Sequence, residues 1–197
     1  MATSIKRHLH PDLERHFPNL TRSLYEVKSE PTPLSNANVV PPYNCIAFAA
    51  GDDKNWWWPD HTGVYHWPAG ITREETVEAF IEMFESLGYK KCDKEIQTAA
   101  KYEPAFEKVA LYYTRLGNPD ARPLSPTHAA LQSKNGMWKS KLGEHEDIEH
   151  VNLECLNGED ITGRIQPYGE PIKIMKRRRG LLGLLISAFL KVACILP

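Results

Sequence analysis

Three apolar stretches in the second half of the chain constrain its fold more than any other feature. They run from Lys108 to Thr114, from His128 to Ser133 and from Met137 to Leu142. The last alternates apolar with polar residues, which is typical of a strand with one buried face. Asn135-Gly136 lies between the last two stretches, and Asn-Gly is the strongest short hairpin signal. The sequence therefore predicts a small antiparallel sheet that contains this hairpin.

The clearest predicted helix runs from Thr72 to Leu87. Thr72 and Glu75 have the spacing of a capping box, and Gly88 is placed to supply a left-handed C-cap. Five apolar residues fall on one face at helical spacing: Val77, Phe80, Ile81, Phe84 and Leu87. A second helix is predicted from Ile148 to Leu156. A helix before a small antiparallel sheet is typical of the α+β class.

Composition limits the class of protein. A chain of 197 residues that is 42% hydrophobic can bury a sizeable core, and its length favours one domain. Its 24 basic and 25 acidic side chains nearly cancel, whereas nucleic-acid binders usually carry a basic excess, so we expect no nucleic-acid partner. The polar N-terminus does not read as a signal peptide. The four cysteines lack CxxC spacing, so we expect reduced thiols, a cytoplasmic location, no metal and no cofactor.

The sequence divides into three regions. Residues 1–42 are polar and rich in proline, residues 43–170 form the predicted domain, and residues 171–197 form a basic and apolar tail. A membrane-spanning helix needs about 20 apolar residues, and the apolar run from Leu181 to Leu196 is shorter and contains Lys191. The tail is therefore a marginal anchor, an amphipathic segment in weak contact with a membrane surface, or the last core helix.

An abrupt apolar patch, Tyr43 to Ala50, contains the residue on which a catalytic hypothesis rests. Pro41 and Pro42 favour an extended approach, and the alanines that follow favour a helix, which Gly51 ends. Cys45 is thus predicted at the N-terminal end of a short buried helix. A helix N-terminus and a nearby imidazole both lower the pKa of a thiol. The alternative is a packed core thiol, because cysteine is among the most buried residue types.

His128 is the predicted partner of Cys45. It opens a strand after a long loop with several prolines, a place where side chains often face a cleft. A cysteine–histidine pair must meet in space and not in sequence, and a third polar group would orient the imidazole. The alternative is a structural histidine held by hydrogen bonds.

The order of these features resembles the NlpC-type papain-like cysteine peptidases and amidases. In that family a cysteine begins a helix, a histidine opens a later strand, and a polar residue follows on the strand after the next hairpin. The resemblance implies an α+β fold in which the helix carrying Cys45 packs on a small antiparallel sheet. It implies that His128 is the base and that Ser140 orients it, where the family has His, Asn or Gln. Gln132 and Glu107 are alternative orienting residues.

Two further positions differ from the NlpC-type pattern. The family has Asp-Cys-Ser-Gly around its nucleophile, and this chain has Asn44-Cys45-Ile46-Ala47. Tyr43 is nearer to the cysteine than the family tyrosine that lines the oxyanion site, and is analogous to it at most.

A second resemblance covers more of the chain, from about Phe17 to Gly169. The chain is similar to an uncharacterised microbial family, a domain of unknown function, in motifs that are specific: YNCIA at 43–47, WWWP at 56–59, YHWP at 65–68, KVALY at 108–112, THAA at 127–130, WKSKLG at 138–143 and DIEH at 147–150. This resemblance implies an α+β domain and brings no established activity.

The run Trp56, Trp57 and Trp58 is the other unusual feature. Three successive large rings cannot all point inward, so at least one is expected at a surface or cleft. The loop either packs rigidly over the Cys45 helix or forms the wall of a site for a peptide or glycan. Both interpretations place aromatic surface near the thiol.

Two groups of histidines carry weaker signals. His61 and His66 lie near Asp60, but no third ligand is evident, so no metal site is predicted. His145 and His150 flank an acidic stretch, EHEDIEH, which is expected to be the solvated start of a helix.

We therefore predict a cysteine hydrolase or amidase that acts on an amide bond in a peptide-like substrate. Cys45 is the nucleophile, His128 is the general base and acid, and Ser140 orients His128. Backbone N–H groups at the helix start stabilise the oxyanion, and Tyr43 and Trp56–Trp58 line the substrate site. One alternative is a catalytically inert interaction module of the same fold that binds through the tryptophan loop, residues 56–68. The other is a peripheral membrane protein held by its tail.

Overall fold

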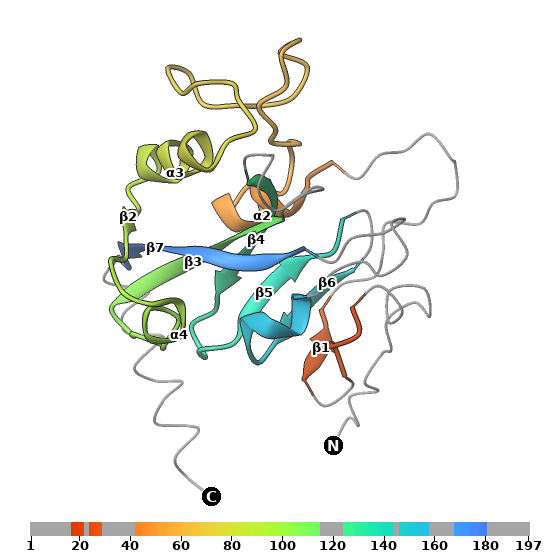
Figure 1. The fold of residues 1–197 in the computed structure, drawn as a ribbon, viewed down its shortest axis with the longest axis vertical. Coiled ribbons are helices and arrows are strands. Elements are labelled where there is room, and N and C mark those ends of the chain that lie inside the picture. The colour runs from red at the N-terminus through yellow and green to blue at the C-terminus, as the bar shows by residue number, and fades with distance from the viewer. Residues whose placement is uncertain are drawn as a thin grey trace, which may run out of the picture.

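In the part of the chain that the structure describes, the protein is built on one antiparallel sheet of seven strands in the order β1-β6-β5-β4-β3-β7-β2 (Figure 1). The computed structural model describes residues 17–21, 24–28, 42–114, 124–143, 146–157 and 168–180. The strands are β1 (Tyr25–Val27), β2 (Lys90–Lys91), β3 (Phe106–Thr114), β4 (Ser125–Gln132), β5 (Trp138–Lys141), β6 (Asp147–His150) and β7 (Glu170–Arg178). The helices are α2 (Cys45–Ala50), α3 (Val77–Ser86), α4 (Ile96–Ala99) and the 3-10 helix η1 (Leu153–Leu156). The predicted α+β class is confirmed.

Each face of the sheet carries its own core. Side chains alternate between the faces of a strand, so Ala110 and Tyr112 of β3 join one cluster while Leu111 and Tyr113 join the other. The first cluster includes residues of α4 and η1, and the second includes residues of α2 and α3. The central strands therefore bury both of their faces.

The three predicted strands and their hairpin are confirmed as β3, β4 and β5, with ends shifted by up to three residues. The turn between β4 and β5 is closed by the Ser133 N–H, which donates to Met137 O at 2.7 Å. Gly136 has φ +94°, a left-handed conformation that costs glycine little.

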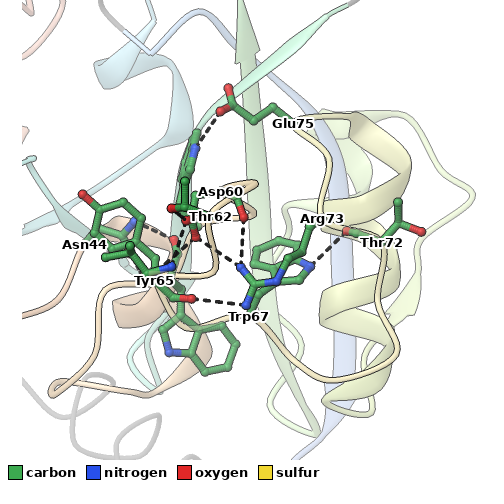
Figure 2. A network of polar contacts seen from close by, with 11 residues as sticks. Asn44, Asp60, Thr62, Tyr65, Trp67, Thr72, Arg73 and Glu75 are labelled. Carbon is green, nitrogen blue, oxygen red and sulfur yellow. Dashed lines mark hydrogen bonds and ion pairs between the residues drawn. The ribbon is translucent and has the colours of Figure 1, made fainter.

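Helix α3 is shorter than predicted. It begins at Val77, and Thr76 caps it by accepting a hydrogen bond from Ala79 N. The predicted capping box is wrong, because the helix starts after both of its members. Thr72 and Glu75 instead accept hydrogen bonds from tryptophan indoles (Figure 2). Thr72 O accepts from the Trp67 indole at 3.0 Å, and Glu75 Oε1 accepts from the Trp58 indole at 2.9 Å.

The helix predicted from Ile148 to Leu156 is also wrong. Its first half is the strand β6, and only η1 is helical. β6 lies between β1 and β5, and hydrogen bonding to both neighbours outweighs the weak local preference for a helix. β1 comes from the region 1–42, which therefore contributes a strand to the sheet.

The sheet also extends past the predicted domain boundary at residue 170. Glu170 to Arg178 form β7, which lies between β3 and β2. Two basic residues of this segment pair within the protein: Arg177 contacts Glu107 at 2.7 Å and Lys176 contacts Glu103 at 3.4 Å. The apolar run from Leu181 to Leu196 lies outside the residues that the structure describes. Within those residues, no helix has the length and hydrophobicity needed to cross a membrane.

Candidate functional site

Asn44 positions the start of α2. Its Oδ1 accepts from Ala47 N at 3.0 Å and from Trp57 N at 3.4 Å, and its Nδ2 donates to Trp57 O at 2.8 Å. One buried side chain thus caps α2 and ties it to the tryptophan loop. Cys45 is the first residue of this helix, and Gly51 ends it with φ +87°, as predicted.

The Cys45 thiol lies beside the strand residue that precedes His128. Its Sγ donates to Thr127 O at 3.9 Å, and the residue is 7% exposed. The β4–β5 ladder consists of the pairs Leu131–Lys139 and Gln132–Trp138, and α2 packs beside both strands. Burial raises the pKa of Cys45 to about 11. The thiol is therefore protonated at neutral pH.

A chain of three buried side chains crosses from β4 through β5 to β6. His128 Nε2 lies 2.9 Å from Ser140 Oγ, and this oxygen lies 3.0 Å from His150 Nε2. His150 Nδ1 lies 2.6 Å from the carbonyl oxygen of Asn152. His128 is 1% exposed and His150 0%. Burial lowers the pKa of His150 to about 4 and that of His128 well below its usual value, so both rings are neutral at pH 7.

The other nitrogen of His128 is unusual. Nδ1 is buried and has no hydrogen-bond partner among the residues that the structure describes. Aromatic rings enclose the imidazole: Tyr168 stacks on it with centroids 3.9 Å apart and planes 3° apart, and Tyr112 meets it edge-on at 5.3 Å. Thr127 Oγ1 holds the Tyr168 backbone by donating to its carbonyl oxygen at 2.6 Å. The ring is rigidly held with one polar atom unpaired.

The structure brings some of the predicted site residues together. His128 and Ser140 are in hydrogen-bond contact, and Cys45 is adjacent to the strand residue before His128. No hydrogen bond joins Cys45 to His128, although both residues are well within the described part of the chain. The alternative orienting residues bind elsewhere. Gln132 donates to Ala100 O, and Glu107 accepts from Tyr89 and pairs with Arg177.

Sequence reasoning missed His150. The acidic stretch around it predicts a solvated helix start, whereas His150 is buried on β6. One signal was present: Ile148 and His150 are two residues apart, so in a strand they share a face. Because Ile148 is apolar, a strand would have placed His150 in the core.

The tryptophan loop is held by polar contacts. Asp60 accepts from Thr62 and from the backbone N–H groups of Val64 and Tyr65, and pairs with Arg73 at 3.1 Å (Figure 2). These contacts fix the turn that follows the WWWP motif. Asp60 is therefore used in structural hydrogen bonds, and no group of three or more potential metal ligands occurs within the described residues.

The three successive tryptophans have different environments. Trp57 is buried in the core beside α2, and its indole donates to Asp52 at 2.9 Å. Trp56 and Trp58 are half-buried, as expected if the three rings cannot all point inward. Tyr43 is also half-buried, and its hydroxyl donates to Asp147 at 2.9 Å. The rings of Tyr43, Trp56 and Trp58 thus retain exposed surface.

The fold and the buried polar chain define an α+β protein with a seven-stranded antiparallel sheet and a cysteine–histidine region at the start of β4. Residues 35–176 match a domain of unknown function, DUF7689, and the chain belongs to this family. The predicted resemblance to an uncharacterised family is thereby confirmed. No curated protein and no solved structure is significantly similar to the chain.

Proposed function

We propose that the protein is a cysteine hydrolase or amidase of papain-like arrangement, with Cys45 as the nucleophile and His128 as the general base. The observation that carries the proposal is the unpaired Nδ1 of His128. A buried polar atom without a partner costs about 1–3 kcal/mol, and such atoms recur where catalysis needs them. The Cys45 thiol contacts the carbonyl oxygen of the preceding residue, Thr127, and is the proposed partner for proton exchange with Nδ1.

The reaction follows from these groups. The Cys45 thiol gives its proton to His128 Nδ1 as sulfur bonds to the carbonyl carbon of an amide. The carbon–nitrogen bond then breaks, and His128 returns the proton to the leaving amine. Water attacks the thioester, again with His128 as the base, and releases a carboxylic acid and the free thiol. Ser140 orients the imidazole through the 2.9 Å contact.

The resting arrangement must change before this reaction. Cys45 Sγ contacts Thr127 O. Cys45 belongs to the core on the α2 face of the sheet, whereas His128 pairs with Tyr112, which belongs to the core on the opposite face. Contact between Sγ and Nδ1 therefore requires a shift of the backbone around Cys45 or His128 and not a side-chain rotation alone. The thiol is neutral at rest because burial raises its pKa to about 11. A buried thiol with a raised pKa needs a base to remove its proton, and contact with His128 would supply that base. The half-buried rings of Tyr43, Trp56 and Trp58 are the proposed binding surface for the peptide-like substrate.

The test is alkylation of the native full-length chain by iodoacetamide at neutral pH, with each cysteine followed by peptide mass spectrometry. Cys45 should react faster than Cys92 and Cys155. His128→Gln should slow Cys45 by about a hundredfold, the lower range for loss of a general base. His66→Gln is the matched control and should leave the rate unchanged. A Cys45 that reacts only after denaturation, or equally fast in His128→Gln, would refute the proposal.

A second candidate is an inert interaction module of the same fold. It is favoured by the burial of Cys45, its high pKa and the lack of a hydrogen bond to His128. The tip of the tryptophan loop supplies a binding surface, because Val64 is 76% exposed and Tyr65 40%. The alkylation experiment separates the two candidates: a Cys45 that is inert in the native state supports the interaction module.

A further inference from the structure

We infer that His150 is a positioning residue that selects the tautomer of His128, acting through Ser140. This inference deepens the proposed function and rests on it. The three side chains form an unbroken chain of contacts, 2.9 Å from His128 to Ser140 and 3.0 Å from Ser140 to His150. The chain ends at a backbone carbonyl, Asn152 O, 2.6 Å from His150 Nδ1.

The contact between His150 and Asn152 determines which group donates in each hydrogen bond of this series. A carbonyl oxygen can only accept a hydrogen bond, so His150 Nδ1 must carry a proton to make the Asn152 contact. A neutral imidazole carries one proton, and burial keeps His150 neutral at pH 7. His150 Nε2 is therefore a bare acceptor. The Ser140 hydroxyl must therefore donate its proton to His150 Nε2.

The donor and acceptor roles of Ser140 then determine the protonation of His128. The Ser140 hydroxyl has one proton and donates it to His150, so toward His128 it can only accept. His128 Nε2 must then carry the proton of the neutral ring. Nδ1 is left as a free lone pair, which agrees with its lack of a donor or acceptor partner. His150 thus makes the unpaired nitrogen of His128 a base.

Loss of the acceptor at position 150 would release this constraint. The Ser140 hydroxyl could turn and donate to His128 Nε2, and the ring proton would then move to Nδ1. In that tautomer Nδ1 cannot accept the thiol proton. His150 therefore acts on the base without touching the reacting atoms, and its replacement should reduce the reactivity of Cys45 while leaving the sheet intact.

The direct test is nitrogen-15 NMR of the labelled full-length chain near pH 7.5, which distinguishes protonated from unprotonated ring nitrogens. The signals of His128 are assigned by their loss in His128→Gln. In the unmodified protein His128 should be protonated on Nε2 and bare on Nδ1. A proton on Nδ1 would overturn the inference.

Two variants test the role of position 150. His150→Phe removes the acceptor, so the Nδ1-protonated tautomer should appear, and Cys45 alkylation should slow by about tenfold or more. His150→Gln keeps an oxygen that can accept from Ser140, and should restore the tautomer and most of the rate. Ser140→Ala, which also breaks the chain, replaces His150→Phe if that variant does not fold. An unchanged tautomer in a folded His150→Phe or Ser140→Ala would contradict the inference.

The experiments can refute the role of His150 and the proposed function independently of each other. If His128→Gln leaves Cys45 alkylation unchanged, the hydrolase proposal is refuted whatever the NMR spectra show. If alkylation depends on His128 but the tautomer does not respond at position 150, the hydrolase proposal stands and the role of His150 is refuted.

Discussion

His128 and His150 couple the ionisation of the site to folding. Both are almost fully buried, and burial lowers the pKa of each, that of His150 to about 4. In an unfolded chain a histidine titrates near its ordinary pKa of about 6.5. As the pH falls below that value, the unfolded state binds protons that the folded state does not. The same burial that keeps His128 a neutral base therefore makes the protein sensitive to acid.

The sign and size of this effect can be predicted. The stabilisation is complete above pH 6.5, the ordinary pKa, and is lost as the pH falls toward about 4, the folded pKa of His150. His150 alone should lower the free energy of unfolding by about 3 kcal/mol over this range, and His128 should add to the loss. Urea unfolding at a series of pH values measures it.

Two variants control this experiment. His150→Gln should reduce the slope between pH 6.5 and 4, because it removes one of the two buried histidines that titrate in the unfolded chain. His66→Gln changes an exposed histidine and should leave the slope as it is. Equal slopes in the unmodified chain and His150→Gln would show that burial of His150 does not control the acid sensitivity.

At the scale of elements, the start of β7 determines how the site is enclosed. Tyr168 stacks on His128 immediately before the strand begins. Gly169 follows with φ +72°, and a Cβ there would collide with the carbonyl oxygen of Tyr113 on β3. The close approach of the two strands thus depends on the absence of a side chain. Tyr168 reaches the imidazole because β7 can pack this tightly.

Gly169→Ala and Gly63→Ala form a matched pair, because Gly63 has φ +71° but open space around it. Gly63→Ala should lower the free energy of unfolding by about 1–2 kcal/mol for the left-handed backbone. Gly169→Ala should lose about 1–3 kcal/mol more from the collision. Chemical denaturation measures both. Equal losses would mean that the contact with Tyr113 is relieved without cost.

At the scale of the whole molecule, the central strands join the two cores. β3 contributes Ala110 and Tyr112 to one cluster and Leu111 and Tyr113 to the other. β7 does the same with Ile174 and Met175. Neither core can lose its packing while these strands stay in place. We therefore expect the described sheet and its helices to unfold as one cooperative unit.

Two probes, one in each core, test whether the cores unfold together. The experiment uses the variant Trp138→Phe, because Trp138 lies in the same core as Cys155. The other tryptophans then report on the face covered by α2 and α3, where Trp57 and Trp67 are buried. Cys155 lies in the opposite core, and its alkylation in a short pulse reports on that face. The fluorescence and alkylation midpoints in urea should coincide. Separate midpoints would show that the two cores unfold independently.

Local signals predicted the part of the fold that depends on neighbours in sequence. The Asn135-Gly136 turn and the alternation around it predicted the β4–β5 hairpin, and the two prolines followed by alanines predicted the start of α2. The same signals failed at β6 and β7. β7 pairs with β3, a partner more than fifty residues earlier, and its basic side chains placed it in the predicted basic and apolar tail. The partner strand, not the local sequence, decides whether such a segment is buried.

The candidate site divides in the same way. The sequence by itself determined that Cys45 begins a helix, that His128 lies on a strand and that Ser140 follows on the next, since each depends on turn chemistry or periodicity over a few residues. Only the tertiary structure placed His150 behind Ser140, stacked Tyr168 on His128 and left Nδ1 unpaired. These features arise where strands distant in sequence meet, because a hydrogen bond depends on separation in space and not along the chain.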